Sequence, residues 1–527
     1  MNSTAGEVLV ASLAAHGVDV VFGIPGTHNL EIYRHLTGYG IRHVTPRHEQ
    51  GAGYAADGYA RTTGRPGVAI VTTGPALLNI ATAVGQSYSD SVPVLVVSPG
   101  MPLHHPQRGT GLLHEMRDQR AAMSTVTRIA HRVTSHAELT EAVAQAFAEF
   151  AAERPRPVHL EVPLDLLAEP AEVEIAAPLR VARRSPDPSL VAGAADALAR
   201  AERPGILAGG GARGAAGELR VLAERLGAPV LTTANGKGVL PEDDLLALGS
   251  ALHLPAAAEF VGDCDVLLAV GTELAPTDWW YGPPARPASL IRVDIDPAQL
   301  LVNARPEIAI AADAAPAVAG LGAALRGVPA REDDRAWAWR ARLRAQARAE
   351  GARWLPWLDA VAAVLARDAI VTADNAMGCY YGALGNLPVR VPAGFCFPTG
   401  FGTLGYAVPA AIGAAIGQPA RQVLAIAGDG GLMFSVQELA TAAAEGIPLP
   451  VVVFVNGGYG EIRAEMREAG IAPLGVDLAV PDFAALARAL GGYGVTVRDP
   501  DHLTAELPDA FGRPGPSLLL VPEDDAP

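Results

Sequence analysis

Short apolar runs rich in valine, isoleucine and leucine alternate with alanine-rich stretches along almost the whole chain. A short run that is apolar at nearly every position suits a strand covered on both faces of a sheet, and an alanine-rich stretch suits the helix that covers it. Repetition of this unit predicts parallel sheets with helices on both faces, an α/β fold. The runs expected to form strands are VVFG (20–23), GVAIVTT (67–73), VPVLVVS (92–98), PVHLEV (157–162), PGILAGG (204–210), APVLTT (228–233), CDVLLAVG (264–271), LIRVDID (290–296), AIVTAD (369–374), QVLAIAG (422–428), PVVVFVN (450–456) and PSLLLV (516–521).

The chain is too long to fold around one core. At 527 residues it is expected to form two or three domains. A proline-rich, charge-mixed passage at 168–189 is predicted to be a linker, and a second passage at 326–350 begins as a linker and becomes a polar helix. We therefore expect three doubly wound parallel-sheet domains at about 1–170, 185–325 and 350–527.

Composition argues against several classes of protein. The net charge of −16 and a pI near 5.3 lack the basic footprint of nucleic-acid binding. Cys264, Cys379 and Cys396 are far apart, which fits free thiols in a reducing compartment and neither a disulfide framework nor a zinc site. The N-terminus has no basic signal region, and no apolar run approaches the ~20 residues that span a bilayer. We expect a cytoplasmic protein with no membrane or nucleic-acid partner.

Two polar residues end neighbouring apolar runs near the C-terminus. Asp429 follows VLAIAG and Asn456 follows VVVFV, with a helix-like segment between them. If that helix is a right-handed crossover, both side chains emerge at one sheet edge, where open α/β sheets bind ligands. Carboxylate and amide oxygens suit Mg²⁺, and Gly428, Gly430 and Gly431 would let the backbone approach a phosphate closely. A simple strand-ending turn is the alternative for GDG alone, and Asn456 argues against it.

Several collinear motifs then identify a family. They are FGIPGTHNLEIY (22–33), PRHEQGAGYAADGYAR (46–61), TTGPALLN (72–79), GFGTLGYAVPAAIGAAIG (400–417) and GDGG…VNGGYG (428–460). Together they resemble the motifs of the thiamine-diphosphate-dependent decarboxylase and acetohydroxyacid synthase superfamily, over nearly the whole chain. The resemblance implies a pyrimidine-binding domain, a middle Rossmann-like domain and a diphosphate-binding domain, with thiamine diphosphate and Mg²⁺ as cofactors.

The resemblance assigns the metal ligands. Asp429 and Asn456 would bind the ion through their side chains and Gly458 through its carbonyl. Members of the family often carry two consecutive asparagines, and here Val455 takes the first position. The ligand position is the second, so this departure leaves metal binding intact.

The resemblance also assigns residues around the thiamine. Glu49 matches the glutamate that activates the pyrimidine ring, and in the family this residue reaches the cofactor of a neighbouring subunit. A homodimer is therefore the minimum active unit, and a homotetramer is expected. Leu404 matches the residue that holds the two cofactor rings in a bent conformation, and Gly402 would offer its backbone to the pyrimidine amine. Thr27 and Thr72, in the matched loops, are further predicted cofactor contacts.

The implied reaction starts from a 2-oxo acid. After CO₂ leaves, the remaining carbon is either protonated to release an aldehyde or attacks a second carbonyl. His28, after GIPGT, and His114, in GLLHEM, are the candidate proton donors. A surface or structural role is the alternative for each of them. His104 and His105 are expected to be surface residues.

Glu461 and Glu465 follow the metal motif and are four residues apart, so they share a helix face. Either could pair with Arg463 or Arg467 on the surface, or could meet a cationic substrate. The overall pattern looks most like that of 5-guanidino-2-oxopentanoate decarboxylases, whose substrate is the keto acid derived from arginine. A guanidinium needs a planar carboxylate partner, which Glu461 could provide.

Three other functions compete with this interpretation. An acetolactate-synthase-type carboligase shares the TTGP motif. A nicotinamide dehydrogenase is suggested by the G-x-G-x-x-G spacing of Gly209, Gly211 and Gly214, but the acidic residue expected ~20 positions later is absent. The family's middle domain often carries such a loop with or without bound FAD or ADP, so whether this protein binds FAD is left open. Glu49, Asp429 and Asn456 together argue against an inactive regulatory subunit.

Overall fold

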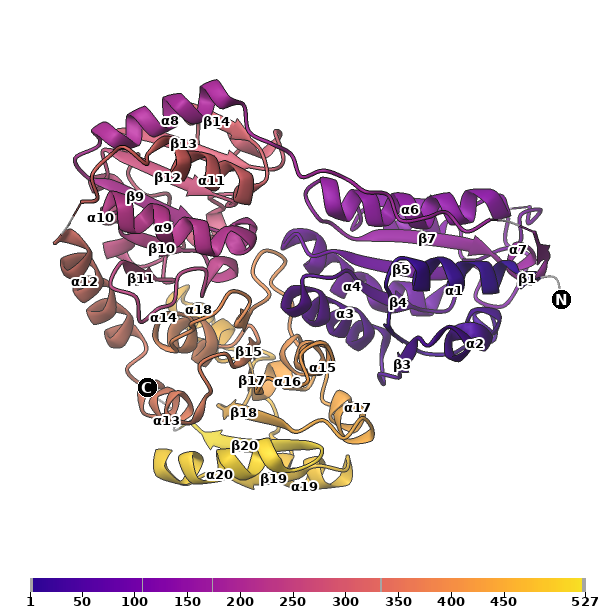
Figure 1. The fold of residues 1–527 in the computed structure, drawn as a ribbon. Helices are drawn as coiled ribbons and strands as arrows, with labels where there is room; N and C mark the ends of the chain where they lie inside the picture. The colour runs from indigo at the N-terminus through magenta and orange to yellow at the C-terminus, as the bar shows by residue number, and fades with distance from the viewer. Residues whose placement is uncertain (1–2, 107, 173, 332–333, 524–527) are drawn as a thin grey trace.

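Three lobes, each built on a six-stranded parallel sheet, make up the molecule (Figure 1). The computed structural model describes residues 3–106, 108–172, 174–331 and 334–523. Helices cover both faces of each sheet, so the expected α/β fold with three doubly wound parallel sheets is confirmed. The exact domain boundaries stay predictions. Among the described residues, no helix combines the length and the apolar character that crossing a bilayer would require.

The N-terminal sheet has the strand order β3-β2-β4-β5-β7-β6. A short antiparallel pair joins the start of this lobe to its end, because β1 pairs with β8. The strands are β1 (Ser3–Thr4), β2 (Val20–Gly23), β3 (Arg42–Val44), β4 (Gly67–Ile70), β5 (Val94–Gly100), β6 (Ile129–Arg132), β7 (Val158–Pro163) and β8 (Pro170–Ala171), and the helices are α1 (Ala5–Ala15), α2 (Leu30–Leu36), η1 (Thr37–Tyr39), α3 (Glu49–Thr63), α4 (Pro75–Ser89), α5 (Gln119–Met123), α6 (His136–Ala152) and α7 (Leu164–Ala168).

The middle sheet has the order β11-β10-β9-β12-β13-β14. In chain order this is 3-2-1-4-5-6, the order of dinucleotide-binding folds, with its switch point between β9 and β12. Its elements are α8 (Pro188–Arg200), β9 (Pro204–Ala208), η2 (Gly210–Ala215), α9 (Ala216–Leu226), β10 (Val230–Thr232), η3 (Ala234–Gly236), β11 (Ala247–Gly249), α10 (Pro255–Asp263), β12 (Val266–Val270), η4 (Pro276–Asp278), β13 (Ser289–Asp294), η5 (Gln299–Leu301), β14 (Ile308–Ala311) and α11 (Ala314–Ala324).

The C-terminal sheet, with the order β16-β15-β17-β18-β20-β19, repeats the topology of the N-terminal one. In chain order both read 2-1-3-4-6-5, so the outer lobes share one plan. Its elements are α12 (Arg335–Glu350), α13 (Leu355–Val364), β15 (Ile370–Ala373), the π-helix η6 (Gly378–Ala383), α14 (Leu384–Asn386), β16 (Phe395–Cys396), α15 (Ala407–Gly417), β17 (Val423–Gly428), α16 (Asp429–Leu432), α17 (Glu438–Ala444), β18 (Leu449–Val455), α18 (Gly460–Glu468), α19 (Phe483–Ala489), β19 (Tyr493–Thr496), α20 (Pro500–Gly512) and β20 (Pro516–Pro522). The polar helix predicted within 326–350 is α12.

The outer lobes meet where α3 packs against α15. A Cβ built on Gly58 would lie 2.1 Å from the Ala410 carbonyl oxygen, and one on Gly413 would lie 1.9 Å from that of Ala55. Any larger residue at either position would push the helices apart. This close approach fixes the start of α3, which carries Glu49, relative to the C-terminal lobe.

A buried ionic network also joins the three lobes. The guanidinium of Arg61 donates to Asp57 at 2.6 Å and to Asp90 at 2.7 Å, and all three side chains are almost fully buried. From the middle lobe, Asn235 accepts a third bond from Arg61 at 2.7 Å. From the C-terminal lobe, the Tyr406 hydroxyl donates to Asp57 at 2.8 Å. Burial alone would lower the pKa of Arg61, but the combined effect of Asp57, Tyr406 and Asp90 outweighs it and raises that pKa well above its ordinary value.

Candidate functional site

The carboxyl ends of β17 and β18 bring Asp429 and Asn456 to one edge of the C-terminal sheet. The two strands are adjacent and parallel, with Gly428 opposite Phe454. Asp429 is buried, and one of its carboxylate oxygens accepts a hydrogen bond at 2.8 Å from the amide of Gly457, the residue after Asn456. The crossover argument from the sequence therefore places these residues as expected.

The side-chain oxygen of Asn456 is buried and has no hydrogen-bond partner among the described residues. Leaving such an oxygen unsatisfied costs about 1–3 kcal/mol. A bound cation would remove that cost. Within the described chain, no cluster of three or more His, Cys, Asp or Glu side chains could hold a metal. An ion here would therefore need amide and carbonyl oxygens as well as Asp429.

Glycines bring the third predicted ligand to the same place. A Cβ built on Gly430 would lie 2.8 Å from the carbonyl oxygen of Gly458, so only glycine at 430 allows this approach. Gly458 itself has φ of +140°, which an L side chain rarely adopts. The predicted ligands Asp429, Asn456 and Gly458 thus lie around one position. Gly428 ends β17, and Gly431 lies in α16, close to Asp429 in the chain.

Asp374, at the end of β15, is a site residue that the sequence reasoning did not single out. The backbone N–H of Gly405 is shared between the two carboxylate oxygens of Asp374, at 2.9 and 3.1 Å. Burial raises its pKa to about 6. This contact holds the turn that carries Leu404, which is half-buried, and Gly402, which has φ of +68° and is exposed. The strand-end argument that identified Asp429 applies equally to AIVTAD.

Glu49 is the first residue of α3 and is half-buried. Its carboxylate accepts a hydrogen bond from the Asn79 amide at 2.9 Å. Glu438, from α17 of the C-terminal lobe, accepts the backbone N–H groups of Arg47 and His48 at 3.0 Å. A Cβ on Gly51 would collide with the Glu438 carboxylate, at 2.5 Å. Glu438 therefore fixes the position of Glu49 at the start of α3. The sequence analysis did not predict this role for Glu438.

The two candidate histidines lie together. Their rings are 5.2 Å apart at 67°, and the hydroxyl of Thr73 lies between them. Burial, with a smaller contribution from His114, lowers the pKa of His28.

Of the two threonines predicted to contact the cofactor, Thr27 is exposed, whereas Thr72 has a buried hydroxyl without a partner among the described residues.

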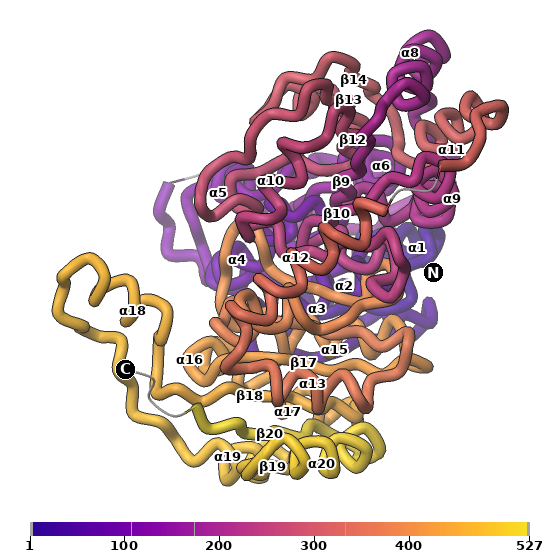
Figure 2. Tube along the Cα trace, turned by 90° about the vertical axis from the view of Figure 1, so that its left-hand side faces the viewer, coloured from indigo at the N-terminus to yellow at the C-terminus, as the bar shows by residue number. Residues whose placement is uncertain are grey.

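A cavity of about 310 Å³ lies between the middle and C-terminal lobes, and Glu461 lines it. The Tyr381 hydroxyl donates to the Glu461 carboxylate at 2.6 Å. Arg463 pairs instead with Asp477, at 2.7 Å, and donates to the Asn456 carbonyl. Glu465 is exposed and is not among the residues lining the cavity. Figure 2 shows that α18, which carries both glutamates, stands out from the body of the molecule.

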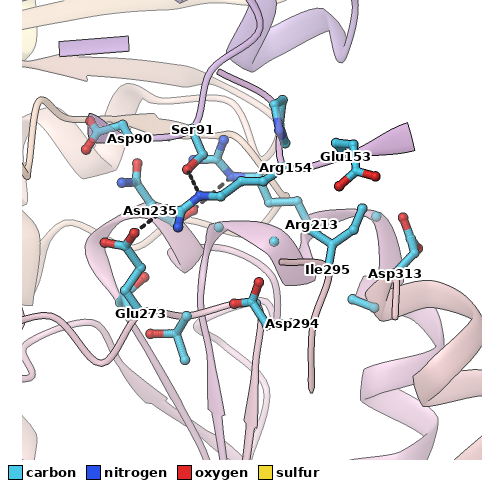
Figure 3. A pocket seen from close by; sticks show the side chains of 18 of the residues that line it. Asp90, Ser91, Glu153, Arg154, Arg213, Asn235, Glu273, Asp294, Ile295 and Asp313 are labelled. Carbon is cyan, nitrogen blue, oxygen red and sulfur yellow. Dashed lines mark hydrogen bonds and ion pairs between the residues drawn. The ribbon is translucent and has the colours of Figure 1, made fainter. Parts of the chain in front are cut away.

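A larger cavity of about 590 Å³ surrounds the glycine loop of the middle lobe (Figure 3). Gly209 and Gly211 pack against the backbone of Gly271, so these glycines let the ends of β9 and β12 approach each other. The strand that follows the glycine loop, β10, does not supply the acidic residue of the fingerprint. An acidic residue comes from a different strand, because Asp294 ends β13 and lines the cavity. Arg213 also faces this space and has a buried nitrogen without a partner among the described residues.

Comparisons with known proteins agree with this arrangement. Residues 3–122 match the N-terminal TPP binding domain of thiamine pyrophosphate enzymes, residues 191–321 match the central domain, and residues 376–521 match the C-terminal TPP binding domain. The chain is 45% identical, over 98% of its length and 93% of the relative, to a probable 2-ketoarginine decarboxylase, AruI, of Pseudomonas aeruginosa.

Acetolactate synthases are more distant relatives. The large subunit from Parasynechococcus marenigrum is 35% identical over 97% of this chain and 86% of that protein. A probable large subunit from Methanocaldococcus jannaschii is 32% identical over 99% of this chain and 92% of that protein. The chain therefore belongs to the thiamine pyrophosphate enzymes, in the group that contains 2-oxo acid decarboxylases and acetolactate synthases.

Proposed function

We propose that this enzyme decarboxylates a 2-oxo acid ending in a guanidinium group, the keto acid derived from arginine, and releases the aldehyde. One observation carries the proposal. Glu461 presents a carboxylate to the cavity beside the metal motif, and no ion pair within the described residues joins it to an Arg or Lys. A carboxylate that lines a cavity without an ion-pair partner is suited to bind a cationic group. The similarity to the 2-ketoarginine decarboxylase supports the same substrate.

The residues at the sheet edge fit thiamine diphosphate and Mg²⁺. We assign Asp429, Asn456 and the Gly458 carbonyl to the ion, and the unsatisfied oxygen of Asn456 supports this assignment. The backbone of Gly428, Gly430 and Gly431 would face the diphosphate. When bound, thiamine diphosphate supplies an electron sink for the pair left on C2 when the C1–C2 bond breaks.

We assign the thiamine end of the cofactor to residues of two subunits. Leu404 and Gly402 would support its rings, with Thr27 and Thr72 as further contacts, and Glu49 of a neighbouring subunit would activate the pyrimidine. A homodimer is then the minimum active form, and a homotetramer stays our prediction. Exposed leucines near the Glu49 and histidine loops, Leu30, Leu78 and Leu113, support an intersubunit contact there.

His28 and His114 would handle the proton. Decarboxylation consumes one proton, which adds to the carbon that has lost CO₂ and gives the aldehyde. His28, His114 and the Thr73 hydroxyl between them would form a path along which a proton can move. The two histidines are therefore proposed as a catalytic pair.

The cavity in Figure 3 would suit a nucleotide, because Arg154 and Arg213 could face phosphates and Asp294 and Asp313 could face hydroxyls. Whether the occupant is FAD stays a prediction that mass spectrometry of extracted cofactors can test. The three cysteines are free and buried, which supports the predicted cytoplasmic location.

Product analysis tests the proposed function. The enzyme with thiamine diphosphate and Mg²⁺ should convert 5-guanidino-2-oxopentanoate to CO₂ and 4-guanidinobutanal. Glu461→Gln should lower kcat/KM for this substrate on the order of a hundredfold, and Glu465→Gln, at an exposed position one turn further along the same helix, should change it less than twofold. Formation of acetolactate from pyruvate, without turnover of the guanidino acid, would establish the carboligase that the acetolactate synthase relatives suggest instead.

A further inference from the structure

Aromatic rings from two lobes line the same cavity as the Glu461 carboxylate. Tyr380 and Tyr381 lie on the π-helix that follows β15, and Trp280 follows η4 of the middle lobe. The Trp280 ring is almost perpendicular to both tyrosine rings, at 89° and 84°, with centroid distances of 5.9 and 5.6 Å. The two tyrosines are 4.7 Å apart at 74°. These three rings and Glu461 all line the 310 Å³ cavity.

Other residues hold the tryptophan in place. The His253 ring stacks on Trp280 at 3.8 Å and 15°. His253 bonds to Glu350 at 2.8 Å, and the indole N–H donates to the Thr277 carbonyl at 3.1 Å. A large aromatic side chain that is 39% exposed is thus kept in one orientation at the cavity, although no apolar core demands it there. Such positioning is typical of a ring that receives a ligand.

We infer that Trp280, Tyr380, Tyr381 and Glu461 form a cage for the planar guanidinium of the substrate. Aromatic faces attract a desolvated, delocalised cation, and a carboxylate bonds its N–H groups. The compact, strongly hydrated ammonium of a lysine-derived keto acid suits such a cage less well. This inference rests on the proposed function and adds the part of the site that separates guanidinium from other tails of equal length.

Two contacts connect the elements of the cage with the segments assigned to the cofactor. Helix α18 begins beside Asn456, because a Cβ on Gly460 would lie 2.8 Å from the Asn456 side-chain nitrogen. Asn375, which also lines the cavity, donates to the Thr403 carbonyl at 2.9 Å, next to Leu404. Glu461 and Asn375, which both line the cavity, thus connect it with the two segments assigned to the cofactor.

A neutral analogue of the same shape gives the sharpest test. We would compare kcat/KM of the holoenzyme for 5-guanidino-2-oxopentanoate and for 5-ureido-2-oxopentanoate, in which the tail has no charge. Trp280→Leu should lower the guanidino-to-ureido ratio about tenfold. Trp337→Leu, which removes a solvent-exposed tryptophan of α12, should leave the ratio within twofold of wild type.

Binding gives a second readout that needs no turnover. Calorimetry should detect 4-guanidinobutanoate binding to the holoenzyme and about tenfold weaker binding to Trp280→Leu. Tyr381→Phe keeps the ring and removes the bond to Glu461, so its loss should be smaller than that of Tyr381→Leu. An unchanged ratio in a folded Trp280→Leu enzyme that still turns over the guanidino acid would overturn the cage alone. Absence of guanidino turnover by wild type would instead overturn the proposed function.

Discussion

The side chains of His28 and His114 share one hydroxyl, since Thr73 Oγ lies 2.5 Å from Nδ1 of the first and 3.3 Å from Nδ1 of the second. His114 reaches this position with φ of +60°, a conformation that is uncommon for a residue other than glycine. The shared hydroxyl supports our proposal that the two rings act as one unit.

If the histidines act together, their effects on turnover should not multiply. We expect His28→Asn and His114→Asn each to lower kcat by about 10²- to 10⁴-fold, the range of general acid–base catalysis. The double variant should be about as slow as the slower single variant, because removing either ring already breaks the path. Steady-state kinetics of the four proteins checks this, and losses that multiply would show that the histidines work independently.

Glu49→Gln should leave the fold and the binding of thiamine diphosphate intact while lowering kcat on the order of a hundredfold or more. Glutamine keeps the shape and the bond to Asn79 but cannot act as a carboxyl group. Circular dichroism, cofactor titration and turnover together check the outcome. Full activity in this variant would refute the role assigned to Glu49.

Glu438→Gln should impair the activation of the pyrimidine ring indirectly, by displacing Glu49. Glutamine offers only one acceptor oxygen where Glu438 receives the N–H groups of Arg47 and His48 and the hydroxyl of Thr441. A small displacement of Glu49 should then lower kcat by about tenfold. Deuterium exchange at C2 of bound thiamine diphosphate should slow in parallel. Glu445→Gln, at the end of the same helix, is the control, and equal effects of both variants would show a general structural role.

Arg61→Met should destabilise the protein by about 3–5 kcal/mol, because it leaves the carboxylates of Asp57 and Asp90 buried without their cation. Arg34→Met, at an exposed ion pair with Glu31, should change stability by less than about 0.5 kcal/mol. Urea unfolding midpoints of the two variants check the difference. Similar midpoints would mean that the network contributes no more than a surface pair.

The strands that the sequence predicted are all interior strands of the three sheets. The strands it did not reveal inside the parallel sheets, β3, β6, β11, β14, β16 and β19, all lie at sheet edges. An interior strand is covered by helices and by two neighbours, so most of its residues are apolar. An edge strand such as β6 or β19 is short and only partly covered, and its sequence carries no such run.

The residues of the candidate site could also be predicted only in part. Asp429 and Asn456 were predictable because parallel strands deliver their ends to one edge, whatever the rest of the fold does. Glu438 and Trp280 were not, because their roles depend on how whole lobes pack. Glu438 meets residues some 390 positions away in the chain, and Trp280 meets tyrosines from another lobe. Local sequence patterns contain no record of such contacts.

Acid should destabilise the N-terminal lobe through His159. This side chain in β7 is fully buried; one ring nitrogen lies 2.8 Å from the Ser98 hydroxyl and the other has no partner among the described residues. Burial lowers its pKa to about 3, from an ordinary value of 6.5. Above pH 6.5 the ring is neutral in both the folded and the unfolded chain. Between pH 6.5 and 3 only the unfolded chain takes up the proton, so the free energy of unfolding falls as pH falls.

The slope from this one group should reach about 1.4 kcal/mol per pH unit. His159→Gln, which keeps a bond to Ser98 but does not titrate, should remove that part of the acid dependence. His131→Gln, at a partly exposed pair with Glu138 on the neighbouring strand β6, should leave the slope as it is in wild type. Urea unfolding at a series of pH values from 7 to 4.5 measures each slope. If His159→Gln and wild type lose stability in parallel, the ring is not held neutral in the folded chain.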